Sequence, residues 1–172
     1  QISYLSNASV NGFFVCGGVG EGAYLSMHEK ETMVTAVQAI ANKNQFICLA
    51  IIKPSTREVI EEIKYFSKFK VDYIAAVTPF YYSMTQKDIL WHYKMIAKES
   101  YAPIVIYNIP ARTHNVLEFD TILALSEEKN IIGIKDSSGD FISFSNFLFS
   151  NSFNSFSFLQ GEDYLCGPSF LC

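Results

Sequence analysis

The feature that most constrains this chain is a short apolar run that recurs six times along the sequence. Most of these runs are apolar at successive positions, which is typical of parallel strands buried on both faces. Most copies end roughly 25 to 29 residues apart, the length of one right-handed strand–helix–strand unit. The sequence therefore predicts an α/β protein with six strands, at Gly12–Gly17, Phe46–Ile52, Tyr73–Thr78, Ile104–Tyr107, Ile131–Lys135 and Phe156–Gln160.

Helical periodicity fills the segments between these strands. Ser26, Ser55 and Thr85 precede three of the helical patterns, and a hydroxyl at that position can accept a hydrogen bond from a free backbone N–H of the first turn. The pattern of strand and helix continues through the whole chain without a linker. The predicted helices are Met27–Asn42, Thr56–Phe69, Gln86–Glu99 and Glu118–Glu128.

Residues 141–158 form an unusual segment that consists almost entirely of Phe, Ser and Asn. Phe141, Phe144 and Phe147 nevertheless keep helical spacing, which predicts a short helix that reaches about Phe149 rather than disorder. We expect the helix to be followed by a boundary near Asn151–Asn154.

Composition and charge exclude several classes of protein. The chain is 49% apolar and 17% charged, so it can form a core, and its net charge of −4 comes without a run of Lys or Arg that could neutralise phosphates. No apolar stretch is long enough for a membrane span, and no basic-then-apolar signal pattern follows Gln1. We therefore expect a soluble, cytoplasmic protein that has neither a nucleic-acid nor a membrane partner.

Cysteine and histidine residues do not have the spacing of metal ligands. The cysteines, which we interpret as reduced thiols, are Cys16, Cys48, Cys166 and Cys172. The histidines are His28, His92 and His114. A metal-dependent enzyme would need clustered histidines and carboxylates, so we expect neither a metal ion nor another cofactor.

Six such units fit either an open doubly wound sheet or a closed eight-strand barrel that lacks two strands. The open sheet would need a glycine-rich phosphate turn and an acidic residue after its second strand. Gly17–Glu21 contains glycines, but Ile51–Lys53 supplies no acid. A barrel requires its reactive groups at the carboxyl ends of strands, and five of the six predicted strands end in polar or glycine-rich segments.

Lys135 is the most informative of these strand-end residues, because it directly follows the apolar run Ile131–Ile134. A lysine at the end of a buried strand loses water, which lowers its pKa and leaves more neutral amine to attack a ketone carbon. The alternative is a lysine that extends into solvent at the barrel rim.

Two further strand ends carry groups that such chemistry needs. Tyr107 could transfer protons as a phenol, or it could simply cover the core. The backbone amides of Gly18–Gly20 could bind a carboxylate, or this segment could be a plain tight turn.

At these residues the chain resembles the dihydrodipicolinate synthase and N-acetylneuraminate lyase family, collinearly over nearly its whole length. Gly133–Asp140 resembles the family's Schiff-base strand, which makes Lys135 the imine lysine, and Tyr107 in Tyr107–Pro110 resembles its phenolic proton shuttle. Val77–Tyr82 resembles the segment whose second aromatic, Tyr81, reaches the active site of a neighbouring subunit. The resemblance implies substrate binding by Gly18, Val19, Arg112, Ser137, Gly161 and Asp163.

The resemblance also implies a fold, an activity and partners. The fold would be a (β/α)8 barrel, present as a single partial catalytic domain over residues 1–172 that covers about strands two to seven and lacks the first and eighth. The activity would be that of a class I aldolase, which makes or breaks a carbon–carbon bond between pyruvate and an aldehyde through an imine on Lys135. We expect a homodimer or homotetramer at full length.

Departures from the family pattern affect activity and substrate. The family has two hydroxyl residues where Gly18 and Val19 stand, so a relay between tyrosines is incomplete, which leaves open a non-catalytic relative that senses keto acids. His114 replaces a glycine and could narrow the entrance.

The substrate signals conflict. Arg112 resembles the arginine with which the synthases hold an acceptor aldehyde's carboxylate. Phe80–Tyr82 and Asn108–Ala111 are more similar to the sialate lyases, yet Tyr164 stands where those lyases carry an acid. A dihydrodipicolinate synthase-like enzyme and a sialate or 2-keto-3-deoxy sugar acid lyase therefore both remain open.

Overall fold

The computed structural model describes residues 2–8, 10–150, 152–153 and 155–172. Its strands are β1 Gly12–Val15, β2 Phe46–Ile51, β3 Tyr73–Val77, β4 Ile104–Asn108, β5 Ile131–Asp136 and β6 Ser157–Gln160. Its helices are α1 Ile2–Asn7, α2 Met27–Ile40, α3 Thr56–Phe66, the 3-10 turn η1 Ser67–Phe69, α4 Gln86–Glu99, α5 Pro110–Thr113, α6 Phe119–Ser126, α7 Phe141–Phe149 and α8 Asp163–Ser169.

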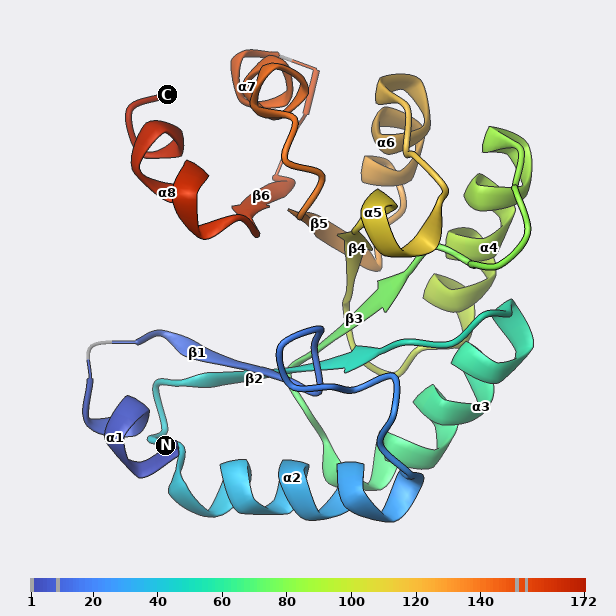
Figure 1. Ribbon diagram of the computed structural model, residues 1–172. Helices are drawn as coiled ribbons and strands as arrows, with labels where there is room; N and C mark the ends of the chain where they lie inside the picture. The colour runs from blue at the N-terminus through green and yellow to red at the C-terminus, as the bar shows by residue number, and fades with distance from the viewer. Residues whose placement is uncertain (1, 9, 151, 154) are drawn as a thin grey trace.

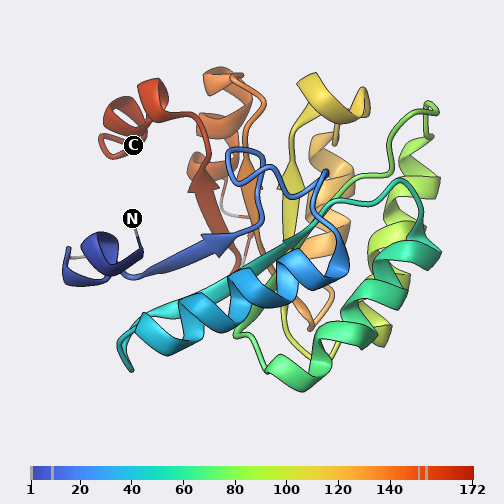
Figure 2. The same ribbon diagram turned by 60° about the horizontal axis from the view of Figure 1, so that its bottom comes forward.

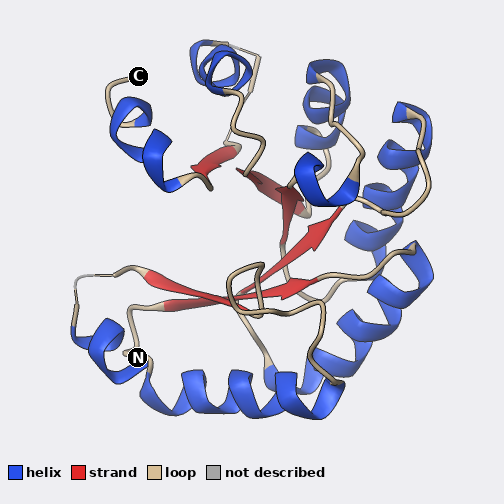
Figure 3. Ribbon diagram, in the orientation of Figure 1, coloured by secondary structure: helices blue, strands red, loops and turns tan. Residues whose placement is uncertain are grey.

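The six strands form one sheet in chain order, and every neighbouring pair is parallel. Figure 1 and Figure 3 show this sheet curled into part of a barrel, with an opening between β1 and β6. The turned view in Figure 2 also shows helices such as α2, α3 and α4 on the outer side of the sheet. A doubly wound sheet would reverse its strand order at a switch point, and this order does not reverse. The structure thus confirms the barrel prediction. Within the described residues, no helix is long and apolar enough to cross a membrane.

Side chains alternate between the inside of the curve and the helix layer, because successive residues of a strand point to opposite faces. Leu49 and Ile51 belong to the large core cluster shared with the helices, where Val59 of α3 also packs. Cys48 and Ala50 belong to a smaller cluster on the inner face, together with Ala75, Val77, Val105 and Tyr107. The strands are therefore apolar on both faces, as their sequences predict.

Helix starts follow the predicted capping residues. The Ser26 hydroxyl accepts from the Glu29 backbone N–H at 3.3 Å, while a Glu29 carboxylate oxygen accepts from the Ser26 backbone N–H at 2.8 Å. Thr85 and Asp88 form the same reciprocal box at the start of α4. Ser55 accepts from the backbone N–H three residues ahead at the start of α3. These bonds satisfy N–H groups that lack a helical partner.

Several predicted strands and helices are longer than the observed ones. β1 ends at Val15 rather than at Gly17, because Cys16 has a left-handed backbone with φ 59° that takes the chain out of the sheet. The third helix tightens into the 3-10 turn η1 after Phe66. The helix predicted over Glu118–Glu128 is α6, which begins one residue later and ends two residues earlier. The short helices α5 and α8 were not predicted.

The Phe-rich segment forms an aromatic cluster between α6, α7 and β6. Its predicted helix is confirmed as α7, Phe141–Phe149. Phe147 stacks on Phe119 at 5.5 Å and on Phe158 at 5.7 Å between ring centroids, and Phe153 packs edge-on against Phe158 at 5.0 Å. Low sequence complexity is thus compatible with a packed structure here. Asn151 and Asn154, at the predicted boundary, lie outside the described residues.

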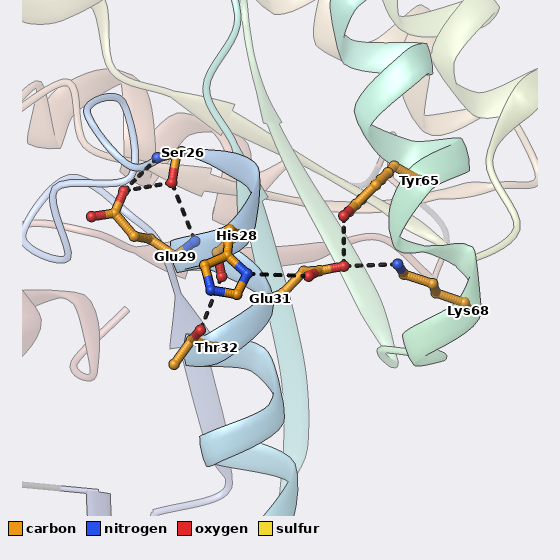
Figure 4. A network of polar contacts seen from close by, with 7 residues as sticks. All are labelled: Ser26, His28, Glu29, Glu31, Thr32, Tyr65 and Lys68. Atoms are coloured by element: carbon orange, nitrogen blue, oxygen red, sulfur yellow. Dashed lines mark hydrogen bonds and ion pairs between the residues drawn. The ribbon is translucent and has the colours of Figure 1, made fainter.

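Polar contacts join α2 to α3 and to η1 in the outer layer. Glu31 of α2 accepts a hydrogen bond from the Tyr65 hydroxyl of α3 at 2.6 Å and forms an ion pair with Lys68 of η1 at 2.7 Å (Figure 4). Beneath them Lys30 and Glu62 form an ion pair at 2.5 Å, and both side chains are at most 2% exposed. A buried pair of this kind costs several kcal/mol when one partner is removed, because the other charge is left in an apolar site.

His92 is a buried residue of α4 that ties together two neighbouring elements. Its Nδ1 lies 2.8 Å from the Thr56 hydroxyl at the start of α3, and its Nε2 lies 3.3 Å from the backbone carbonyl oxygen of Val77 at the end of β3. A carbonyl oxygen only accepts, so Nε2 carries the proton and Nδ1 accepts from Thr56. Burial lowers the pKa of His92 to about 4, although the bond to Val77 raises it slightly.

We predict that His92 makes the fold sensitive to acid. The folded-state pKa of about 4 lies below the unfolded value of about 6.5, so its contribution is fully present above pH 6.5 and is lost as pH falls from there toward 4. Between pH 7 and pH 5 this loss is about 2 kcal/mol. Urea unfolding at the two pH values should show a smaller difference for His92→Gln than for the wild type.

His28→Gln is the matched control, because that side chain is exposed on α2. It should keep the wild-type pH dependence. Equal pH dependence in His92→Gln and the wild type would contradict the assignment.

Candidate active site

Lys135 and Tyr107 lie side by side at the carboxyl ends of neighbouring strands. The register of β4 and β5 pairs Tyr107 with Lys135 directly, and Tyr107 belongs to the inner cluster. The Lys135 amine, Nζ, lies 4.0 Å from the centroid of the Phe14 ring and 4.5 Å from that of Tyr107. The two rings themselves meet edge to face at 5.4 Å. The amine is therefore enclosed by aromatic faces inside the curve of the sheet.

Burial lowers the pKa of Lys135 from its usual value, because the charged ammonium loses water. Cys48 and the carboxylates of Glu162 and Asp163 act in the opposite direction. The net direction increases the fraction of neutral amine at neutral pH. A neutral amine is the form that attacks a carbonyl carbon, so this environment suits a nucleophile.

The Tyr107 phenol is held in its protonated form. Burial raises the pKa of Tyr107, while the Gly18 backbone and the Ser137 side chain lower it in part and the Glu162 carboxylate raises it further. A Cβ atom at Gly18 would lie 3.4 Å from the Tyr107 hydroxyl oxygen, which places the glycine loop beside the phenol. Tyr107 can thus donate a proton to a group bound near Lys135.

The glycine loop after β1 turns sharply above this pair. A side chain at Gly22 would overlap the backbone carbonyl of Cys16, so only glycine fits there. The Gly22 N–H donates to the Gly17 carbonyl oxygen at 3.1 Å, which closes the loop. The Val19 side chain is fully exposed, so it contributes no wall to the site. What this loop presents beside Tyr107 is backbone at Gly18.

Ser137 and Gly161 meet where β5 and β6 end. Ser137 is buried, and its backbone N–H donates to the Asn108 carbonyl oxygen at 2.8 Å. The Gly161 N–H donates to the Asp136 carbonyl oxygen at 2.7 Å. A side chain at Gly161 would overlap the Ser137 hydroxyl, so the glycine allows this hydroxyl its position near the phenol.

A polar network behind the site was not found by sequence reasoning. The Asn108 amide donates to one oxygen of the Asp136 carboxylate at 2.5 Å, and the Ser138 hydroxyl donates to the other at 2.7 Å. Burial raises the pKa of Asp136, and the two donors lower it in part. Asn108 and Asp136 are paired in the register one residue after Tyr107 and Lys135, so they tie the same two strand ends together on the helix side. In the sequence, Asn108 directly follows Tyr107 and Asp136 directly follows Lys135, and this adjacency could have identified the network.

The structure does not bring every predicted residue to the amine. Tyr81 is 82% exposed and packs against Tyr82, with ring centroids 4.9 Å apart. Arg112 is exposed on α5. Asp163 is exposed in the first turn of α8, but its carboxylate still raises the pKa of Lys135. The group in direct proximity consists of Lys135, Tyr107, Gly18, Ser137 and Gly161, to which the structure adds Phe14. Among the described residues, no three His, Cys, Asp or Glu side chains gather as metal ligands would.

Comparison with known proteins identifies the family of this chain. The model of the family described as "Dihydrodipicolinate synthetase family" matches residues 1–171. The chain belongs to the dihydrodipicolinate synthetase family. It is 33% identical over 173 residues to a 4-hydroxy-tetrahydrodipicolinate synthase of Flavobacterium psychrophilum, a match that covers 99% of this chain and 58% of that protein. A second such synthase, from Clostridium acetobutylicum, is 35% identical over 94% of this chain and 56% of its own length.

Solved structures of this family share the fold. The dihydrodipicolinate synthase of Acinetobacter baumannii, solved in complex with pyruvate, matches with a TM-score of 0.90 and 31% identity, over 99% of this chain and 60% of that one. The synthase of Methylacidiphilum fumariolicum matches with a TM-score of 0.91 and 30% identity, over 99% and 57%. The chain thus spans somewhat more than half the length of the relatives that it matches.

We predict that the Glu162 carboxylate moderates the reactivity of Lys135. Glu162→Gln removes a negative charge that raises the pKa values of both Lys135 and Tyr107, so both should fall. The rate at which Lys135 reacts with an amine-acylating reagent, followed by mass spectrometry across pH, should shift to lower pH. Glu127→Gln, after α6 at the far end of the strands, is the control and should leave the profile unchanged. An unshifted profile in Glu162→Gln would count against this electrostatic account.

Proposed function

We propose that this chain carries the catalytic centre of a pyruvate-dependent class I aldolase, a lyase that uses Lys135 as a Schiff base. The observation that carries the proposal is the partly buried Lys135 amine, with its lowered pKa, beside the protonated Tyr107 phenol. Membership of the dihydrodipicolinate synthetase family supports it. The synthase bound to pyruvate supports the keto acid as the first substrate. No metal or other cofactor takes part in this chemistry.

The chemistry proceeds through an imine and an enamine. The neutral Lys135 amine attacks the ketone carbon of pyruvate, and water leaves as the imine forms. Loss of a proton from the pyruvate methyl carbon gives an enamine, which attacks the carbonyl carbon of an aldehyde. Tyr107 first donates its phenol proton to the oxygen that leaves as water, the resulting phenolate then accepts and returns protons in the later steps, and hydrolysis of the imine releases the product. The pyruvate part is bound by the backbone at Gly18 and Val19 and by the Ser137 hydroxyl. Gly161 and Asp163 belong to the loop beside it.

For the second substrate we favour a carboxylated aldehyde such as aspartate semialdehyde. Arg112 is an exposed cation on α5, and its guanidinium can hold a carboxylate through two hydrogen bonds. The relatives named 4-hydroxy-tetrahydrodipicolinate synthase support the same choice. The competing substrates are sialic acids or deoxy-sugar acids, which a lyase of this type would cleave. A keto-acid sensor is less well supported, because these relatives bear the names of enzymes.

We also propose a homo-oligomer in the cytoplasm. Tyr81 and Tyr82 project from the loop after β3 with exposed fractions of 82% and 75%, which is typical of a surface that packs against another subunit. We assign Tyr81 to the active site of that neighbouring subunit, in a homodimer or homotetramer. The four cysteines in the described chain are free, which suits a reducing compartment.

The decisive experiment traps the imine. Intact protein treated with pyruvate and borohydride should gain one reduced pyruvyl adduct on Lys135, located by peptide mass spectrometry. Tyr107→Phe should still form the adduct but turn over at least about a hundredfold more slowly, since proton transfer by a positioned side chain contributes that much or more. Absence of the adduct, or its location on another lysine, would overturn the mechanism, and an adduct without turnover of any aldehyde would favour the sensor.

The substrate class is tested at Arg112. Arg112→Ala should raise the KM for aspartate semialdehyde by about tenfold or more and leave the KM for pyruvate nearly unchanged, because a charge-assisted hydrogen bond contributes about 1.5 to 3 kcal/mol. Arg57→Ala on α3, whose side chain is exposed, is the control and should change neither KM. A protein that cleaves only sialic or deoxy-sugar acids would exclude the synthase activity.

A further inference from the structure

Asn115 is a buried hub in the segment that follows α5. Its side chain is only 4% exposed. The amide nitrogen donates to the carbonyl oxygens of Pro79 at 2.8 Å, Tyr82 at 3.0 Å and Thr113 at 3.2 Å. The amide oxygen accepts from the Met84 backbone N–H at 2.7 Å. Both ends of this amide are therefore satisfied by backbone groups, most of them from a different loop.

That other loop, residues 79–84, leads from β3 to α4 and depends on Asn115. In the described chain, residues 79–84 form hydrogen bonds outside helices and strands only with the Asn115 side chain. The aromatic rings of Tyr81 and Tyr82 are largely exposed, so they supply little packing to hold the loop. Tyr81 also has a left-handed backbone with φ 81°, which is strained for a residue with a side chain. Phe80 and Met84 pack against the core, but the polar contacts that hold this unfavourable backbone conformation all come from one amide.

The segment that bears Asn115 is itself firmly held. The Thr113 hydroxyl donates to the carbonyl oxygens of Ile109 and Asn115, each at 3.3 Å. The Gln86 side chain donates to the Val116 carbonyl oxygen at 2.8 Å. Arg112 lies within this segment, on α5. A shift of the Arg112 segment must therefore carry the Tyr81 loop with it.

We propose that Asn115 is a positioning residue that locks the Tyr81 loop to the Arg112 segment and so sets the geometry in which the second substrate is held. The inference rests on the proposed function, since it concerns the side of the site away from the imine. Among the described residues, the Asn115 side chain forms hydrogen bonds with Pro79, Tyr82, Met84 and Thr113, and with neither Lys135 nor Tyr107. Its loss should therefore weaken binding of the aldehyde while imine formation with pyruvate continues.

Asn115→Asp is the most informative substitution. It keeps the side-chain shape and the acceptor for Met84, but it places a carboxylate oxygen against the carbonyl oxygens of Pro79 and Tyr82 in place of a donor. The matched control is Asn130→Asp. The Asn130 amide likewise donates to two carbonyl oxygens, of Ala97 at 2.8 Å and Ser100 at 3.3 Å, but it lies at the opposite end of the strands, just before β5.

The experiment measures three quantities on the intact protein and both variants. They are the KM for aspartate semialdehyde, the pyruvate concentration that half-saturates borohydride trapping at Lys135, and the hydrogen exchange of residues 79–84. In Asn115→Asp we expect the KM for the aldehyde to rise by about tenfold, exchange in the loop to accelerate, and half-saturation by pyruvate to stay within about twofold. Asn130→Asp should change none of the three.

Each other outcome has a defined meaning. An unchanged KM for the aldehyde in Asn115→Asp, or equal effects in the two variants, overturns the positioning role. Loss of pyruvate trapping in Asn115→Asp also overturns it, because Asn115 would then support the imine half of the site. Absence of trapping in the wild type overturns the proposed function instead. If Asn115→Asp does not fold, Asn115→Ser, which keeps one donor, is judged by the same three criteria.

Discussion

The structure depends on the parallel pairing of six strands in the order in which they occur along the chain. This pairing brings every strand's carboxyl end to the same rim, because parallel strands all run in one direction. It also separates the side chains of each strand into an inner and an outer set. Tyr107 and Lys135 share the inner set through the register of β4 and β5, whereas Asn108 and Asp136 share the outer set one residue later. The placement of the Tyr107–Lys135 pair and of the Asn108–Asp136 pair therefore follows from one constraint.

Placing an amine inside this curve has an electrostatic cost that also increases the fraction of neutral amine. Burial disfavours the ammonium form of Lys135, and the Phe14 and Tyr107 rings offer only weak compensation for the lost water. The Glu162 and Asp163 carboxylates oppose the shift. The same burial keeps the Tyr107 phenol protonated, so one apolar environment suits both roles that we propose, a nucleophile and a proton donor.

Neutral amide and imidazole side chains that do not contact the Lys135 amine hold the strand ends in place. Asn108 contacts Asp136, His92 contacts the end of β3, and Asn115 holds the loop that follows it. Each of them bonds to backbone or to a carboxylate in a buried setting, where an unsatisfied polar group would be costly. Side-chain hydrogen bonds thus add to the backbone hydrogen bonds that fix the segments after the strand ends.

The sequence by itself determined the fold class, because a periodic alternation of apolar strands and capped helices is a local property that Ser26, Ser55 and Thr85 mark correctly. It also placed Lys135 and Tyr107 at strand ends, since a polar residue that closes an apolar run shows in the sequence. Only the tertiary structure decided that Phe14 flanks Lys135 and that Asn115 holds Pro79, Tyr82 and Met84. Those contacts depend on the curvature of the sheet and on left-handed residues such as Cys16 and Tyr81, and neither is encoded by hydrophobic periodicity.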